Sequence, residues 1–249
     1  MQVLVGFVIA LLMGLTGVGG GSFTTPALVL LAGIPGAVAV GTALAFTTVV
    51  RLIAVPFYWA GNQVHLPYLR FMLIGAIPGV VSGGYLLRRT EARFSNPVVL
   101  IAIGALLVIS SLLTVLRPNP GGRFCKRRSQ WLAWLAFPIG IETGFSSAGS
   151  GAMGTLLLFN FSGLDTAEVV GTDLAFGTAI AATGALLHFS FGTVSATLLR
   201  GLLLGGIPGA LVGCVLARRL PPRRIRKAIL VTTALLGVTL LIRGSGLLV

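Results

Sequence analysis

The chain has 249 residues, of which 55% are hydrophobic and only 9% are charged, and its mean hydropathy is +1.00. Soluble domains carry about 25% charged residues, so this composition excludes the soluble class. The net charge of +13 would suggest a nucleic-acid partner in a soluble protein, but here the basic residues cluster in short gaps between apolar spans. We therefore expect an all-α polytopic membrane protein that binds no nucleic acid.

In chain order, the first series of apolar segments begins with an interrupted helix. A segment up to about Gly17 meets a glycine-rich break, and the short segment Ser22–Ala32 follows. At about 16 Å if helical, it would cross half of a bilayer. Full-length spans are then predicted at Val38–Trp59, Leu69–Leu87 and Pro97–Leu116.

The second series repeats this order. A segment ends near Gly144, a break follows, and the short segment Ala152–Phe161 precedes full spans at Ala167–Phe189, Leu198–Ala217 and Ala228–Ile242. We divide the chain into a first membrane repeat (residues 1–116), a basic linker (117–129) and a second membrane repeat (130–249). Whether the short segments count as separate spans decides between eight and ten crossings, and the sequence leaves both open.

The two series are copies of one unit. A stretch of about 76 residues recurs at a constant offset of 130 without a gap, and about a third of the aligned positions are identical. The segments that realign are Gly14–Gly21 with Gly144–Gly151, Gly41–Phe46 with Gly171–Phe176, Gly75–Gly79 with Gly205–Gly209, and Arg88-Arg89 with Arg218-Arg219. A duplicated apolar unit with a broken segment near its start is typical of secondary transporters.

The distribution of basic residues favours halves of opposite orientation. The linker holds five basic residues and the segment Arg218–Lys227 holds six, whereas the segment Arg88–Arg93 of the first half has a net charge of only two. Inverted halves place the two strongly basic loops on one side of the membrane, as the positive-inside rule requires. We therefore predict two inverted repeats of four or five segments each, with the linker in the cytoplasm.

The breaks predict a binding site for an anion. Glycine-rich backbone at membrane depth is tolerated where protein or water satisfies its polar groups, and a helix that begins there directs free N–H groups at the break. Two such ends near the midplane would bind an anion. The residues that we expect to contact it are Gly19, Gly20, Gly21, Ser22, Gly149, Ser150 and Gly151. The alternative is that these glycines only allow close packing of helices.

Five further side chains are candidates for transport chemistry. Thr42 and Thr172 occupy equivalent positions one turn into the next span, so we expect their hydroxyls to reach the same ligand. Arg51, deep in its span, suits a multi-oxygen anion, although it could instead extend toward the membrane surface or pair with Asp173. Asp173 and Glu142 are intramembrane carboxyl groups and candidates for proton coupling. Asp173 could alternatively partner a base or cap a helix break.

Other reactive side chains do not form a recognisable centre. His65 and His188 stand near span ends, where interfacial histidines are common, and we expect neither to bind a metal. Cys125 and Cys214 have no CxxC spacing, so we interpret both as unpaired thiols. The five acidic residues are scattered along the chain, so an enzyme is disfavoured and no cofactor is expected.

Two proline–glycine pairs interrupt spans at equivalent positions in the two halves. They are Pro78-Gly79 and Pro208-Gly209. Proline removes a backbone hydrogen bond and permits a kink, which could act as a hinge for alternating access. We favour the simpler interpretation, a static kink that makes room for a neighbouring helix.

The duplicated motifs resemble those of the TauE/SafE family of sulfite and organosulfonate exporters over nearly the whole chain. The motifs concerned are Gly17-Val18-Gly19-Gly20-Gly21-Ser22, Pro26 and Gly41-Thr42 in the first half and Gly171-Thr172-Asp173-Leu174 in the second. The resemblance implies a multi-pass permease of the bacterial or archaeal inner membrane for small sulfur-containing anions or related carboxylates, driven by the proton gradient. The second break, Ser147-Ala148-Gly149-Ser150-Gly151, is less glycine-rich than the family pattern.

The sequence as a whole therefore predicts a secondary transporter that moves a small oxyanion by proton-coupled alternating access. Its partners would be the anion and the lipid bilayer, with a homodimer left open. A passive anion channel could use the same half-helices and remains an alternative, while a membrane-embedded enzyme is much less well supported.

Overall fold

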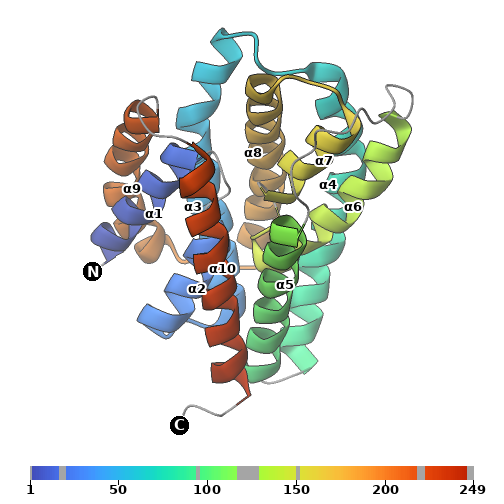
Figure 1. Cartoon of the computed structure of the whole chain (residues 1–249). Coiled ribbons are helices and arrows are strands. Elements are labelled where there is room, and N and C mark those ends of the chain that lie inside the picture. Colours follow the sequence, from blue (N-terminus) through green and yellow to red (C-terminus); the bar gives the residue numbers. More distant parts are fainter. Residues whose placement is uncertain are drawn as a thin grey trace.

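The computed structural model describes residues 2–16, 21–93, 96–116, 129–149, 152–217 and 222–245, and over these ranges the chain forms ten α-helices (Figure 1). In chain order the helices are α1 (Gln2–Thr16), α2 (Gly21–Ala32), α3 (Gly36–Ala60), α4 (Leu66–Arg93), α5 (Asn96–Leu116), α6 (Ser129–Ser146), α7 (Ala152–Phe161), α8 (Thr166–Ser190), α9 (Ala196–Ala217) and α10 (Pro222–Gly244). The described ranges contain no β-strand, which confirms the all-α class.

The two short segments predicted from the sequence are confirmed as separate short helices. α2 has 12 residues and α7 has 10, so each is about 15–18 Å long and spans half of a hydrocarbon core. Both helices are followed by a glycine with positive φ, Gly33 at 65° and Gly163 at 66°. Glycine adopts this left-handed conformation without steric cost, which lets the chain leave the helix and turn back.

The long helices agree with the predicted full spans, with two extensions. Helix α10 begins at Pro222, before the predicted start at Ala228, and α4 continues beyond its predicted end. α3, α4, α8 and α9 are each long and apolar enough to cross a membrane. The sequence predicted that the span in α4 ends at Leu87, but the helix continues to Arg93. Arg88 and Arg89 are therefore helical, and the Arg88 guanidinium lies 4.7 Å from the centre of the Phe191 ring.

Helices α1 and α9 pack closely and run in the same direction, and so do α4 and α6. Glycines on α9 and α4 allow this approach: a methyl group added to Gly205 would overlap the Val3 carbonyl oxygen, and one added to Gly75 would overlap that of Ala133. The same holds for Gly209 against Phe7, one turn further along α9. Small residues of this kind let helix backbones approach in membranes, where apolar side chains gain little from leaving the lipid.

Equivalent helices of the two halves contact each other and run antiparallel. Residues that face each other along α3 and α8 are Gly41 with His188, Leu44 with Gly184, and Arg51 with Gly177. Those that face each other along α5 and α10 are Pro97 with Gly244 and Gly104 with Gly237. The C-terminal end of α5 and the N-terminal end of α10 therefore lie at the same end of the bundle.

The proline–glycine pairs lie where helices pack most closely. A methyl group on Gly79 would overlap the Phe137 carbonyl oxygen, and one on Gly209 would overlap that of Phe7. Pro78 and Pro208 are exposed on the opposite sides of their helices. This arrangement agrees with the simpler interpretation, in which the pair makes room for a neighbour.

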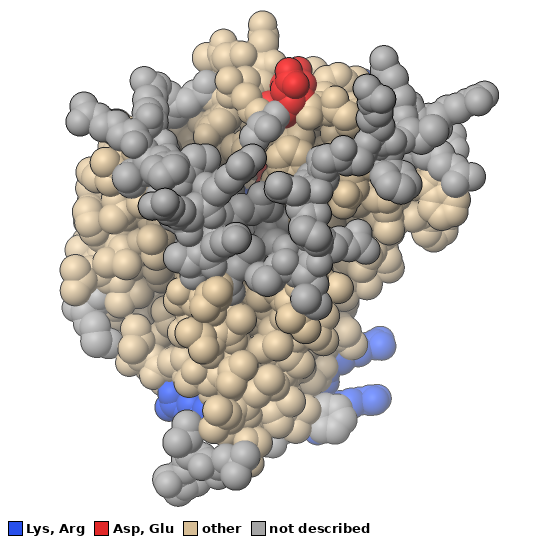
Figure 2. Space-filling view, in the orientation of Figure 1, with Lys and Arg blue, Asp and Glu red and all other residues tan. Residues whose placement is uncertain are grey.

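Charged side chains lie toward the ends of the bundle. On the face shown in Figure 2, the acidic residues that are coloured appear at one end and the coloured basic residues at the other. Inside the bundle, by contrast, Arg51 and Asp173 are each only 2% exposed. Buried charges of this kind are rare in membrane spans and are usually functional, so we expect a functional site around these two residues.

We predict that Gly205→Val separates α1 from α9, because its side chain would meet the Val3 backbone. The Tm of the detergent-solubilised protein, measured by loss of the monodisperse chromatographic peak after heating, should fall by about 5 °C. The control is Gly61→Ala, since an added methyl group there meets only the Gln63 side chain. An unchanged Tm in Gly205→Val would contradict the close packing of α1 on α9.

Candidate functional site

The two breaks meet at the centre of the molecule, where the start of α2 contacts the segment after α6. The Thr25 and Ser147 hydroxyl oxygens are 2.6 Å apart. The Ser147 hydroxyl donates to the Gly21 carbonyl oxygen at 3.1 Å, so Thr25 is left to donate to Ser147. The Ser22 hydroxyl donates to the Ala148 carbonyl oxygen at 3.3 Å. Hydroxyl groups at the breaks thus join the two halves of the chain to each other.

Two local backbone features make this junction possible. Ser147 has a φ of 65°, which is uncommon for a residue with a side chain, and it occupies the position equivalent to Gly17. A methyl group on Gly21 would overlap the Ser147 carbonyl oxygen, so glycine is required at this position. The strained residue is therefore held in place by contacts with the opposite half.

A cluster of charged and polar side chains lies beside the junction. The Thr155 hydroxyl on α7 donates to an Asp173 carboxylate oxygen on α8 at 2.8 Å. Arg51 on α3 interacts electrostatically with Asp173. Glycines leave room for both charged groups, because a methyl group on Gly154 would overlap the Asp173 carboxylate and one on Gly177 would overlap the Arg51 guanidinium.

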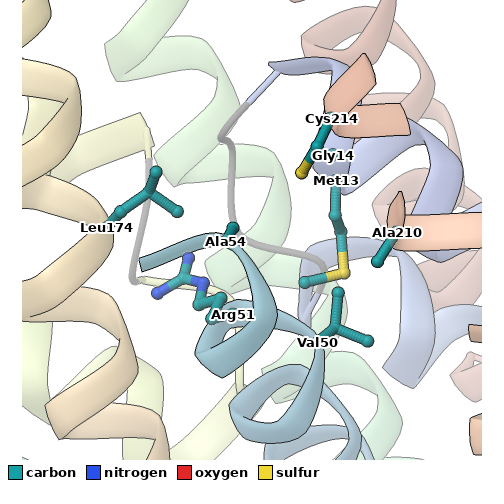
Figure 3. Close-up of a pocket in the computed structure, with 8 residues that line it drawn as sticks. All are labelled: Met13, Gly14, Val50, Arg51, Ala54, Leu174, Ala210 and Cys214. Atoms are coloured by element: carbon teal, nitrogen blue, oxygen red, sulfur yellow. The ribbon is translucent and has the colours of Figure 1, made fainter. Parts of the chain in front are cut away.

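A small cavity borders the cluster on the side of α1 and α9 (Figure 3). Its volume is about 10 Å³, enough for roughly one water molecule and too small for an oxyanion. Its lining residues are Met13, Gly14, Val50, Arg51, Ala54, Leu174, Ala210 and Cys214. Apart from Arg51 the lining is largely apolar, so a guanidinium group is the main polar feature that this cavity offers.

Thr42 and Thr172 do not share one site in this structure. The Thr42 hydroxyl oxygen accepts a hydrogen bond from the Ser195 backbone N–H at 3.1 Å, and that of Thr172 accepts one from the His65 N–H at 2.9 Å. These contacts lie at opposite ends of the antiparallel α3–α8 pair, on the order of 30 Å apart. Each threonine therefore fixes the loop that follows the equivalent helix of the other half.

The remaining predicted residues are distributed as follows. Glu142 is 5% exposed on α6 and faces a separate cavity between α5, α6 and α7. Gly149 follows the junction, where a methyl group would lie 2.9 Å from the Thr143 hydroxyl. Gly19, Gly20, Ser150 and Gly151 lie outside the described residues.

The sequence interpretation missed two features of the site. Thr155 was not singled out, although its identity with Thr25 across the repeat could have identified it. His188 was expected at the interface but is only 1% exposed, with its Nε2 atom 3.1 Å from the Gly144 carbonyl oxygen and its Nδ1 atom 2.9 Å from the Thr193 hydroxyl. His188 is near the end of its predicted span, and the sequence contained no sign that neighbouring helices cover its ring.

The described part of the chain contains no group of three histidine, cysteine, aspartate or glutamate side chains that could hold a metal ion. Among the described residues, the groups gathered at the centre are the Arg51 guanidinium, the Asp173 carboxyl group, hydroxyls and backbone. These groups can bind an anion and exchange a proton.

Comparisons with known proteins point to a family of membrane transporters. The family model described as sulfite exporter TauE/SafE matches residues 2–240. The chain is 28% identical to the probable membrane transporter protein YjnA of Bacillus subtilis (strain 168), over 90% of this chain and 92% of that protein. It is 25% identical to the probable membrane transporter protein YdhB of the same organism, over 96% and 98% of the two chains. No solved structure matches the chain.

We predict that Thr155→Val removes the hydrogen bond to Asp173 and lowers the free energy of unfolding by about 2 kcal/mol. The measurement is unfolding in mixed micelles with increasing denaturing detergent. Thr183→Val is the matched control, because the Thr183 hydroxyl donates only to the Ala179 carbonyl oxygen within its own helix. Equal effects of the two substitutions would show that the Thr155–Asp173 bond contributes nothing specific.

Proposed function

The chain belongs to the TauE/SafE family of membrane transporters, and on that premise we propose that it is a secondary transporter for small sulfur-containing or related organic anions such as sulfite or sulfonates. It would act in the inner membrane of a bacterium or archaeon by proton-coupled alternating access. The observation that carries the proposal is the Arg51 guanidinium, buried between the two halves beside the junction of the broken helices.

The arrangement of the helices supports inverted repeats. The equivalent helices α3 and α8 run antiparallel, and so do α5 and α10. A two-fold axis in the membrane plane would relate such pairs, as in many transporters whose sites lie at the interface of the repeats. With such an axis, the two strongly basic segments, residues 117–129 and 218–227, would face one side of the membrane, as expected for the cytoplasmic side.

Arg51 is suited to bind the anion. A guanidinium group presents a planar set of N–H donors that can bind two oxygens of a sulfite or sulfonate group at once. It remains charged when buried, and the surrounding apolar side chains strengthen its attraction for an anion. The backbone N–H groups at the start of α2 lie near the same junction and would add further donors.

Asp173 is suited to couple the anion to a proton. In the structure it interacts with Arg51, so the internal charges of the cluster are balanced. When Asp173 takes up a proton, the guanidinium loses its internal counterion and an incoming anion can replace it. The anion and the proton would then bind and leave together, which keeps the charge of the buried cluster constant and couples their movement in the same direction.

The small volume of the cavity beside Arg51 fits one step of such a cycle. About 10 Å³ does not accommodate an oxyanion, so the two halves have to separate on one side before the anion reaches Arg51. The hydroxyl bonds between Thr25, Ser147 and Gly21 join the halves at this point and would be the ones that break. Alternating access therefore corresponds to opening this junction toward one side at a time.

We predict that the protein reconstituted in proteoliposomes takes up ³⁵S-labelled sulfite with saturable kinetics and accumulates it when the lumen is made alkaline. Asp173→Asn should retain exchange of labelled for unlabelled sulfite but lose accumulation driven by the pH gradient, because the amide cannot carry the coupling proton. Glu91→Gln makes the same chemical change near the end of α4 and serves as the control.

Two results would contradict the proposal. Flux that does not saturate and ignores the pH gradient would indicate a passive anion channel. Accumulation by Asp173→Asn at the rate of the unmodified protein would remove Asp173 from the coupling step.

A further inference from the structure

A second cavity lies between α5, α6 and α7, separate from the cavity beside Arg51. Its volume is about 540 Å³, within the range of sites that hold small organic molecules. The residues that line it are mostly aliphatic, and none of them lines the Arg51 cavity. The polar side chains in its lining are Ser110, Glu142 and Asn160.

Glu142 is the buried polar end of this cavity. Its side chain is 5% exposed, and its Oε1 atom has no hydrogen-bond partner among the residues that the structure describes. The carboxyl group forms a hydrogen bond with the Ser110 side chain. One carboxyl oxygen thus remains available inside an apolar space, where a polar group without a partner is costly.

No charged side chain in the described ranges forms an ion pair with Glu142. This distinguishes it from Asp173, which has Arg51 and Thr155 as neighbours. An ionised carboxylate at this depth needs a cation, and the described part of the chain does not supply one. The position equivalent to Glu142 in the first half is Leu12, so the repeat does not require a carboxyl group here.

The rim of the cavity indicates how a ligand would enter. Ile109 and Leu113 on α5 and Leu135 on α6 line the cavity and are also exposed at the surface, at 53%, 45% and 36%. In a membrane these apolar side chains would face lipid. The cavity is therefore accessible to molecules that partition into the bilayer, and its aliphatic lining matches an apolar body.

We propose that this cavity is a binding site for a lipophilic amine, with its ammonium group on Glu142 and its apolar body along α5, α6 and α7. The ammonium group supplies both the missing charge and the hydrogen-bond donor for Oε1. The Ser110 hydroxyl lies beside the Glu142 carboxyl group, and Asn160 is a further polar residue in the lining of the same cavity. The site is independent of the anion site at Arg51, so its occupancy is measured without reference to transport.

The test uses the full-length protein in detergent and the fluorescent primary amine dansylcadaverine as the probe. Saturable binding is expected, and Glu142→Gln should weaken it by about tenfold, because the amide keeps the shape of the side chain but loses the charge. N-acetyl-dansylcadaverine, which lacks the ammonium group, should bind more weakly and respond little to the substitution. Glu91→Gln provides the matched control and should leave binding unchanged.

A second variant tests the geometry without changing the buried carboxyl group. Leu113→Trp places a larger side chain at the exposed rim and should weaken both probes while the protein remains folded. The proposal is overturned if Glu142→Gln binds the amine as tightly as the unmodified protein does. It is also overturned if the amine and its acetylated form bind equally well, or if Leu113→Trp has no effect.

Discussion

The need to satisfy backbone polar groups at two interrupted helices shapes the centre of this fold. Lipid offers no hydrogen-bond partner, so a carbonyl exposed at a break must find one inside the protein. Hydroxyl groups from the opposite half supply it: Ser147 donates to the Gly21 carbonyl oxygen and Ser22 to that of Ala148. Within the second half the Ala148 N–H also donates to the Ser146 hydroxyl at 3.3 Å, but the Gly21 and Ala148 carbonyl oxygens accept their bonds from the opposite half, so the central junction involves both repeats.

The same chemistry recurs at both ends of the α3–α8 pair. Thr42 and Thr172 accept hydrogen bonds from the backbone of Ser195 and His65, each in the other half. Equivalent residues thus make equivalent bonds, and the two halves are fixed at the centre and at both ends. A transporter built this way would have to exchange a limited set of hydroxyl bonds to change its conformation, while the glycine contacts of α1 with α9 and of α4 with α6 persist.

The charged groups break this symmetry. Arg51 faces α8 from α3, and its equivalent in the second half is Ala181; Asp173 on α8 has Ala43 as its equivalent. Duplicating both residues would bury two further charges in the same small volume, which is costly in an apolar interior. The scaffold can therefore be symmetric while these two buried charged groups each occur in one half only.

The repeat and its helices could be predicted from the sequence because they depend on local signals. Hydrophobic length predicted the spans, and glycine-rich breaks predicted the short helices α2 and α7 with nearly their observed bounds. An interaction of Arg51 with Asp173 was one of the alternatives considered from the sequence, and the two side chains do interact in the structure.

The sequence did not predict which residues of one half contact which residues of the other half. Thr42 and Thr172 were expected to share a ligand because the sequence places them at similar depths in their spans. The sequence does not show, however, that α3 pairs with α8. The antiparallel pairing sends them to opposite ends. Glu142 was grouped with Asp173 as a buried carboxyl group, yet the two face different cavities, since helix rotation decides which neighbour each side chain meets.

We expect Arg51 to bind the anion between the two halves. The most direct test of this expectation is equilibrium binding of ³⁵S-labelled sulfite to the purified protein, compared between Arg51→Gln and the control Arg200→Gln, which changes an exposed arginine at the start of α9. The account predicts that Arg51→Gln raises the Kd by about a hundredfold while Arg200→Gln leaves it unchanged. An equal Kd for Arg51→Gln and the unmodified protein would contradict it.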